Sequence, residues 1–337
     1  MGCRRIVTIE DIDLSWMEAG ASSPGSGDAR PLVLLHGLSD SNNTWDKVAS
    51  TLALRRRVLM PDLPGHGRSS RPDATYSVAY YARVLTAWVR AVGLTDFDLV
   101  GHSLGGGVAQ RMLIELARIS PGTPAPRVHR LGLIASGGLG REVAWVLRLA
   151  AATGAVERIG QPFMHRGTRV GMRLLGGEFR EPDRRELARL NDRAGTARAL
   201  SRTLGASVGL EGQRLHFMDH AHEVPSLPPM AIFWGERDRV IPISHAERVT
   251  TFLDGVTIRR FARAGHYPHR ESVHEFVPAL LRFLETDQVR PRIKIKARSK
   301  GLRDMLRDFL AKREPAPSSA ASPHGLPEGR QLAAANG

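Results

Sequence analysis

A serine in a short glycine-flanked segment is the residue of this chain best placed to act as a nucleophile. Ser103 lies in Gly101–Gly105, which reads GHSLG. The segment follows an apolar stretch at 97–100 typical of a strand and precedes 106–119, whose apolar spacing predicts a helix. Glycines allow a sharp turn that leaves the hydroxyl exposed, and the start of a helix favours developing negative charge. The pattern therefore predicts a nucleophilic serine.

A Gly-rich turn that contains serine is also common between strands and helices that carry no chemistry. A nucleophilic serine needs a base to take its proton and an acid to orient that base. It also needs two hydrogen-bond donors for the oxyanion that forms after attack. The rest of the chain must therefore bring these groups to the place where the serine lies.

Apolar runs that alternate with helical patterns predict the sheet that would do this. Residues 4–18 alternate as two edge strands would, and the later runs are continuously apolar, as in strands buried on both faces of a parallel sheet. Residues 21–29, rich in Ser and Gly, predict a surface turn. We expect an α/β fold with ligands at the carboxyl ends of the strands. The buried strands are expected at 31–37, 57–60, 97–100, 130–135, 230–234 and 257–261, and the main helices at 78–92, 106–119 and 272–284.

Five motifs in order resemble those of the α/β-hydrolase superfamily. They are HGL at 36–38, DLPGHGRS at 62–69, GHSLGG at 101–106, GERDRVIP at 235–242 and AGHYPHRE at 264–271. The resemblance covers about residues 6–285 and is specific for the fold, much less so for the substrate. It implies a mostly parallel sheet flanked by helices, with a serine, an acid and a histidine in that order.

The resemblance implies an acid and a base for Ser103. Asp238 follows the strand at 230–234 and matches the acid of the family, and His266 follows the last strand and matches the base. Some members carry the acid after the preceding strand, but residues 135–138 here read ASGG. His266 would take the serine proton, while Asp238 would keep the other ring nitrogen protonated. His269, three residues further on, is the nearest competitor as base.

The same resemblance implies an oxyanion hole made of backbone N–H groups. The donors would be Leu104, after the nucleophile, and Leu38, after the His-Gly pair. The histidines show no spacing typical of metal ligands, and no dinucleotide fingerprint is visible. We therefore expect neither a metal nor an organic cofactor.

A segment of nearly ninety residues, 139–225, lies where family members carry a helical cap, before the strand that precedes the acid. The hydrolase core would then comprise 1–138 and 226–287. Helices are expected at 141–152, 182–193 and 196–208. Apolar side chains of the cap would line the substrate pocket, although each is as consistent with the core of the cap. The candidates are Trp145, Leu149, Phe163, Met164 and Leu204.

These features favour a serine hydrolase acting on a small apolar carboxylic ester. The superfamily's dehalogenases and epoxide hydrolases use Asp as nucleophile, whereas this chain has Ser103. Hydrolysis of the C–C bond of a ring-fission product and acyl transfer on the same three residues stay open, as does a receptor-like binding member with little turnover. The partner would be a small-molecule ester or acyl substrate.

The net charge of +14 does not indicate nucleic-acid binding, because much of it lies outside the resemblance. Residues 289–313 hold 10 basic and two acidic residues and contribute +8. Within the tail, 288–337, an apolar stripe predicts a short helix that either docks on the domain or rests on an anionic membrane or a protein through 290–313. The stripe consists of Leu302, Met305, Leu306, Phe309 and Leu310.

The location of the protein is predicted from what its sequence does not contain. The N-terminal residues show no apolar segment of a secretory signal, and no apolar run approaches the roughly 18–20 residues needed to cross a bilayer. Cys3 is the single cysteine, which excludes internal disulfides. We expect a cytoplasmic protein.

Overall fold

The computed structural model describes residues 2–20, 29–119, 124–174 and 179–294. Within these ranges an eight-stranded sheet has the order β1-β2-β4-β3-β5-β6-β9-β11. β1 pairs with β2 and β2 with β4 antiparallel, and the other neighbours are parallel. The mostly parallel sheet is the predicted one. Its strands are β1 (Cys3–Ile9), β2 (Ile12–Ala19), β3 (Leu32–Leu35), β4 (Val58–Pro61), β5 (Asp96–His102), β6 (Arg127–Ile134), β9 (Met230–Gly235) and β11 (Thr257–Phe261).

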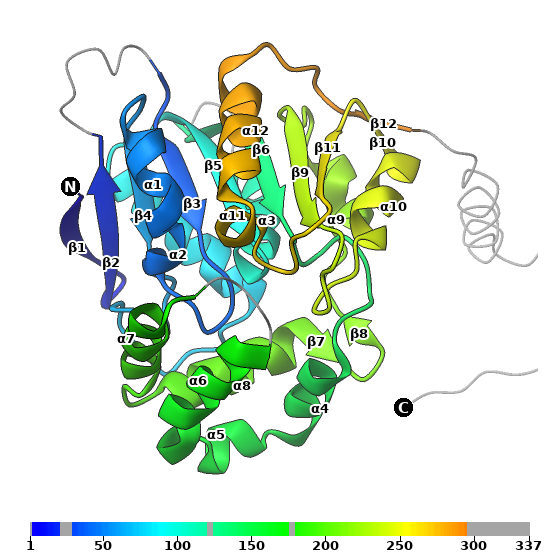
Figure 1. The fold of residues 1–337 in the computed structure, drawn as a ribbon. Helices are drawn as coiled ribbons and strands as arrows, with labels where there is room; N and C mark the ends of the chain where they lie inside the picture. The colour runs from blue at the N-terminus through cyan, green and yellow to red at the C-terminus, as the bar shows by residue number, and fades with distance from the viewer. Residues whose placement is uncertain (1, 21–28, 120–123, 175–178, 295–337) are drawn as a thin grey trace, which may run out of the picture. The chain divides into compact units, whose positions relative to one another are not determined.

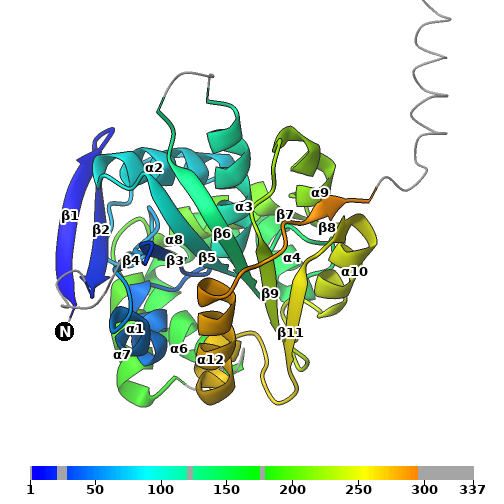
Figure 2. The same cartoon turned by 90° about the horizontal axis from the view of Figure 1, so that it is seen from above.

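Helices cover both faces of the sheet, which explains why its central strands are continuously apolar. In β3, Leu32 and Leu34 pack with α1 (Asp46–Ala53) and α12 (Val273–Glu285), whereas Val33 and Leu35 face the opposite core. Alternate side chains of a strand point to opposite faces, so a two-sided core needs an unbroken apolar run. Figure 2 shows the sheet between these two layers. The opposite core contains α2 (Val78–Ala91), α3 (Leu104–Ala117) and α10 (Ser244–Phe252).

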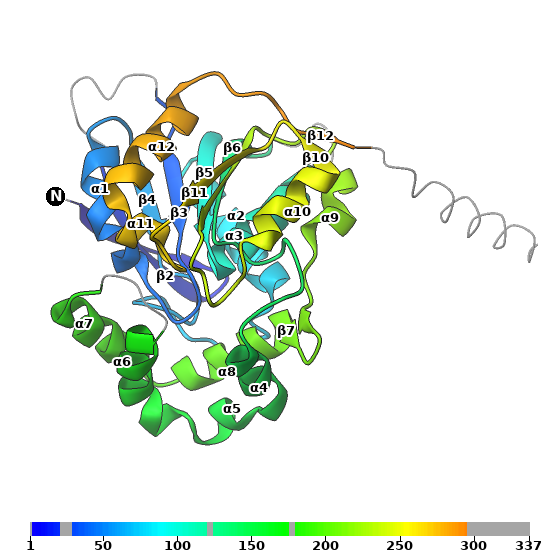
Figure 3. The ribbon, with the colours of Figure 1, turned by 45° about the vertical axis from the view of Figure 1, so that its right-hand side comes forward.

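The segment between β6 and β9 is largely helical; its helices α4 to α8 lie beyond one end of the sheet, whereas α9 packs against α3 (Figures 1 and 3). Two of its helices follow the prediction closely, and α4 starts four residues later than expected. The short α5 and η2 and the longer α6 were not predicted; α6 contains two glycines, which lower its intrinsic helix propensity. The elements are α4 (Trp145–Thr153), α5 (Ala155–Ile159), η2 (Gln161–Phe163), α6 (Met164–Leu174), α7 (Glu181–Asn191), α8 (Thr196–Ser207), β7 (Val208–Gly209), β8 (Gly212–Gln213), α9 (Phe217–His220) and η3 (Ala221–Glu223).

The domain extends past the boundary predicted for it. β12 (Arg292–Ile293) pairs antiparallel with β10 (Leu253–Asp254), and the Lys294 N–H donates to the Phe252 carbonyl at 2.7 Å. The compact unit therefore runs to Lys294, and placing the start of the tail at residue 288 was wrong by seven residues. These pairings join segments about forty residues apart, so no local sequence pattern predicts them.

Two other expectations fall largely outside the described residues. They are the surface turn at 21–29 and the apolar helix of the tail, Leu302 to Leu310. Among the helices that the structure describes, none is both long and apolar enough to cross a membrane.

Candidate active site

The turn at Ser103 is as sharp as the two flanking glycines suggest. Ser103 joins β5 to α3 with a φ of 52°, a left-handed conformation that non-glycine residues seldom adopt. A Cβ atom on Gly101 would lie 2.3 Å from the Gly105 carbonyl oxygen, and one on Gly105 would lie 2.4 Å from the Leu35 carbonyl oxygen. A side chain at Gly101 would therefore open the turn, and one at Gly105 would push it away from β3. Both the local sequence and the packing against β3 require glycine here.

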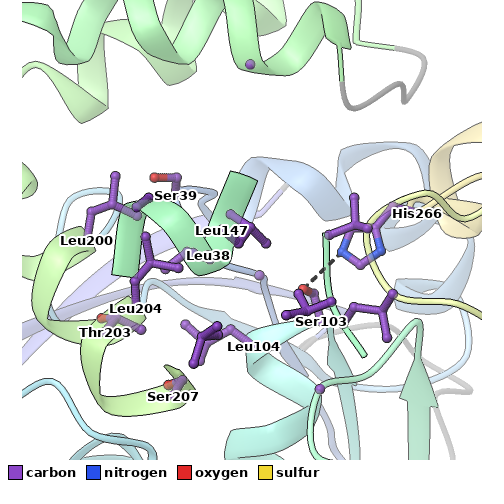
Figure 4. A pocket seen from close by; sticks show the side chains of 18 of the residues that line it. Leu38, Ser39, Ser103, Leu104, Leu147, Leu200, Thr203, Leu204, Ser207 and His266 are labelled. Atoms are coloured by element: carbon purple, nitrogen blue, oxygen red, sulfur yellow. Dashed lines mark hydrogen bonds between the residues drawn. The ribbon is translucent and has the colours of Figure 1, made fainter. Parts of the chain in front are cut away.

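The structure brings Ser103, His266 and Asp238 together in one hydrogen-bonded row. His266 Nε2 lies 3.0 Å from Ser103 Oγ, the contact dashed in Figure 4, and His266 Nδ1 lies 2.8 Å from Asp238 Oδ2. The three residues follow β5, β11 and β9, whose carboxyl ends meet at one edge of the sheet. The order of contacts is the one that general-base activation of a serine requires.

The carboxylate of Asp238 is held rigidly toward His266. Its side chain is fully buried, and its other oxygen, Oδ1, accepts hydrogen bonds from the N–H groups of Val240 at 2.8 Å and Ile241 at 3.0 Å. These bonds leave Oδ2 directed at the imidazole. Because Nδ1–H donates to Oδ2, the lone pair of a neutral His266 lies on Nε2, toward the serine.

The neighbouring histidines make contacts of other kinds. His269, the competing candidate base, lies 3.1 Å from Thr44 Oγ1 through Nε2 and stacks on Trp45 with ring centroids 4.6 Å apart. His102 donates from Nε2 to the backbone carbonyl of His266 at 2.8 Å. Burial holds the pKa values of His102 and His269 well below the ordinary value, so both are neutral near pH 7. They can support the site but cannot supply charge to it.

Leu38 and Leu104 both lie beside Ser103 on the cavity wall (Figure 4). Leu104 is the first residue of α3, and the first N–H groups of a helix have no intrahelical partner. Leu38 lies in a turn that touches the serine, because a Cβ atom on Gly37 would come within 3.2 Å of Ser103 Cβ. Two backbone donors close to a serine can stabilise an oxyanion.

Ser103 opens into an apolar cavity of about 450 Å³ between the sheet and the elements α4, α5, η2, α6 and α8. Of the five predicted pocket residues, Phe163, Met164 and Leu204 line it. The structure does not bring the other two to the cavity: Trp145 and Leu149 lie on the outer face of α4, with 70% and 55% of their surface exposed. Residues that the sequence reasoning missed include Leu147 and Ala150 on the inner face of α4, and Thr168, Met172, Leu200 and Thr203.

The spacing of one helix contained a signal that could have found some of these residues. Met164, Thr168 and Met172 recur every four residues along α6, are buried and line the cavity. In α4 no such signal exists, since both of its faces carry leucine.

The charge of the cavity wall restricts what it can bind. Among the described residues that line it, none is Asp, Glu, Lys or Arg, and Tyr267 stays neutral because burial raises its pKa well above the ordinary value. No group of three or more His, Cys, Asp or Glu side chains in the described ranges could hold a metal ion.

Comparison with known proteins agrees with the fold. A family model described as the α/β-hydrolase fold matches residues 30–272. The chain belongs to this family. An uncharacterized protein from Mycobacterium tuberculosis is 31% identical over 274 residues, which cover 78% of this chain and 77% of that protein.

Two further similar proteins are named for an activity. The 2-hydroxymuconate semialdehyde hydrolase of Pseudomonas putida is 26% identical over 270 residues, covering 77% of this chain and 88% of that protein. The solved structure of an esterase from Exiguobacterium antarcticum matches with a TM-score of 0.66 at 19% identity, covering 85% of this chain and 100% of the esterase. The latter likeness concerns the fold alone.

Proposed function

We propose that this α/β hydrolase cleaves an apolar carboxylic ester through an acyl-enzyme on Ser103. The observation that carries the proposal is the contact of 3.0 Å between His266 Nε2 and Ser103 Oγ at the wall of an apolar cavity. Its support is chemical: the serine has a base, the base has a buried acid, and the site excludes charged side chains that would oppose an apolar substrate.

The reaction proceeds in two balanced halves. Ser103 Oγ attacks the ester carbonyl while His266 Nε2 takes the hydroxyl proton, and the N–H groups of Leu38 and Leu104 stabilise the oxyanion. The intermediate collapses, the C–O bond to the alcohol breaks, and His266 returns the proton to the leaving oxygen. Water then attacks the acyl-enzyme with His266 again as base, which releases the carboxylic acid and the free serine. Asp238 holds the imidazole and stabilises its protonated form.

The cavity favours a small uncharged acyl group. Its volume lies at the lower end of the roughly 300–1,000 Å³ typical of small-molecule sites. The polar side chains of the described wall are uncharged: hydroxyls such as those of Thr168 and Thr203, the amide of Gln213, and the imidazoles of His102 and His266. Burying an ionised group without a partner is strongly unfavourable, so an apolar acyl chain fits this wall better than a charged one.

Hydrolysis of a C–C bond is a second candidate, favoured by the similarity to the Pseudomonas putida hydrolase over 270 residues. The same serine, histidine and oxyanion donors serve it. A ring-fission product that bears a carboxylate would need a cation or several N–H donors inside the cavity. The neutral side chains of the lining give this candidate less support than the ester.

The test combines turnover with covalent labelling. Wild-type protein should hydrolyse p-nitrophenyl butyrate, and a fluorophosphonate probe should label Ser103; Ser103→Ala should lose both. Added alcohol that captures the acyl group would indicate transfer, and turnover of 2-hydroxymuconate semialdehyde without ester hydrolysis would favour C–C cleavage. Labelling without turnover of any substrate would favour a binding member of the family. A Ser103→Ala variant that still hydrolyses the ester would contradict the proposal.

A further inference from the structure

The turn that carries Leu38 contains Ser39, which, like Ser103, has an uncommon backbone conformation. Residues 37–40 form a four-residue turn in which the Asp40 N–H reaches the Gly37 carbonyl at 3.4 Å. Ser39, at the third position, has a φ of 56°. A positive φ at this position normally requires glycine, because a side chain there crowds the backbone. The turn beside the oxyanion site therefore needs support from elsewhere in the molecule.

That support comes from the cap, through the side chain of Asn191. Asn191 ends α7 and is completely buried. Its Nδ2 group donates to the Ser39 carbonyl at 2.8 Å and to Thr168 Oγ1 on α6 at 3.2 Å. Both amide hydrogens are thus used, one on the core and one on the cap. The amide therefore links the turn of Leu38 to α6, which lines the cavity, and belongs itself to α7.

The end of α7 is itself fastened to the core, so Asn191 is not a freely moving group. Arg71 donates from Nη2 to the Leu190 carbonyl at 3.0 Å and from Nε to Thr196 Oγ1 at 2.8 Å. Arg193 donates to the Gly67 carbonyl at 3.0 Å. These bonds join the residues on both sides of Asn191 to the segment 67–71 of the core, which keeps the amide at a defined height above the turn.

We propose that Asn191 is a positioning residue that holds the Leu38–Ser39 turn in the form in which the Leu38 N–H faces the oxyanion. The inference rests on the proposed ester hydrolysis and adds a cap residue to it. By this route the placement of α7, which contributes none of its described residues to the cavity wall, affects the chemistry at Ser103. The bond acts on the transition state, where the oxyanion is present, and not on the uncharged substrate.

The first experiment replaces the amide by an apolar group of similar size. Asn191→Leu should lower kcat for p-nitrophenyl butyrate about tenfold or more with little change in KM. It should weaken inhibition by n-butylboronic acid by a similar factor, because the boronate forms a tetrahedral anion on Ser103 Oγ that needs the same donors. The control on the same helix is Arg185→Leu, whose guanidinium is 71% exposed and bonds Glu181 within α7. This control should leave kcat and boronate affinity unchanged.

A second experiment separates positioning from general stability of the cap. Glycine adopts a positive φ without crowding, so Ser39→Gly makes the turn less dependent on the amide. In a double-mutant cycle, the double variant Ser39→Gly/Asn191→Leu should have a kcat at least threefold higher than that of Asn191→Leu alone. Its thermal stability should stay as low as that of Asn191→Leu. Unchanged kcat in Asn191→Leu, or a loss matched by lower stability and not restored by glycine, would overturn the inference. Absence of hydrolysis and labelling in the wild type would instead overturn the proposed function.

Discussion

His102 Nε2 donates a hydrogen bond to the backbone carbonyl of His266 at 2.8 Å, and their rings lie 4.9 Å apart. The residue before the proposed nucleophile thus supports the residue proposed as its base. Because His102 belongs to the Ser103 turn, the two strand ends that carry the serine and the histidine are tied together. The bond fixes the backbone of His266 while Asp238 fixes its ring.

His102→Phe should show how much this tie contributes. Phenylalanine keeps an aromatic ring of similar size but cannot donate, and the net contribution of a neutral hydrogen bond is about 1 kcal/mol. If the bond serves to position His266 for proton transfer, its loss raises the activation free energy by about this amount, and kcat falls about fivefold with little change in KM. Steady-state kinetics and the rate of fluorophosphonate labelling measure both effects. If the variant has the kinetics and thermal stability of the wild type, the hydrogen bond from His102 does not affect the position of the His266 imidazole.

The three residues of the hydrogen-bonded row should behave as one unit. Ser103→Ala or His266→Ala should reduce kcat by about 10⁴–10⁶, and Asp238→Asn by a somewhat smaller factor, because each removes the same activated nucleophile. The double variant Ser103→Ala/His266→Ala should be no slower than Ser103→Ala alone. Losses that multiply would show that the two residues act independently.

Leu204 and Leu149 offer a matched pair for testing the cavity wall. Leu204 is 3% exposed and lines the cavity, whereas Leu149 lies on the outer face of α4. Leu204→Ala enlarges the cavity, so the ratio of kcat/KM for p-nitrophenyl octanoate to that for the acetate should rise roughly tenfold. Leu149→Ala should leave the ratio as it is. A shift of equal size in both variants would assign acyl-chain preference to something other than the wall.

Stability should depend on pH through buried neutral histidines. Burial lowers the pKa of His66 to about 4, below the value near 6.5 of an unfolded chain. The unfolded state therefore binds a proton more readily, and the stabilisation that is present above pH 6.5 is lost as the pH falls toward 4. At pH 5 the loss is roughly 2 kcal/mol.

A variant isolates this effect from opposing groups. Burial raises the pKa values of Asp40 and Asp62 to about 6, which favours the folded state on acidification. Urea unfolding is measured for the wild type and for His66→Phe at pH 7 and at pH 5. Asp40 and Asp62 contribute equally to the pH dependence of both proteins, so their contribution cancels in the comparison. The difference between the two pH values should be about 2 kcal/mol more unfavourable for the wild type. Identical pH dependence would show that His66 is protonated to the same extent in the folded and unfolded states.

The basic residues beyond Lys294 should be dispensable for catalysis. A chain shortened to end at Lys294 retains β12, its pairing with β10 and the bond from Lys294 Nζ to the Thr250 carbonyl. Its kcat and thermal stability should equal those of the whole chain. If the removed segment rests on anionic lipid, salt-sensitive binding to phosphatidylserine vesicles is lost with it. Lower stability of the shortened chain would favour docking of the segment on the domain instead.

Local chemistry allowed the sequence alone to determine the strands, the Ser103 turn and the family. The glycines at 101 and 105 permit the close backbone contacts of the turn, and unbroken apolar runs require a sheet covered on both faces. Asp238 and His266 were found only because the family resemblance placed them after particular strands. Nothing in their own neighbourhoods distinguishes them from other loop residues.

Tertiary structure decided which side of each cap helix faces the cavity. Trp145 and Leu147 are two residues apart, so they lie on opposite sides of α4, and both are apolar; only the position of the helix over the sheet exposes one and turns the other inward. The bond between Asn191 and Ser39 joins residues 152 positions apart. No spacing in the sequence encodes such a contact, because it depends on where α7 comes to rest on the core.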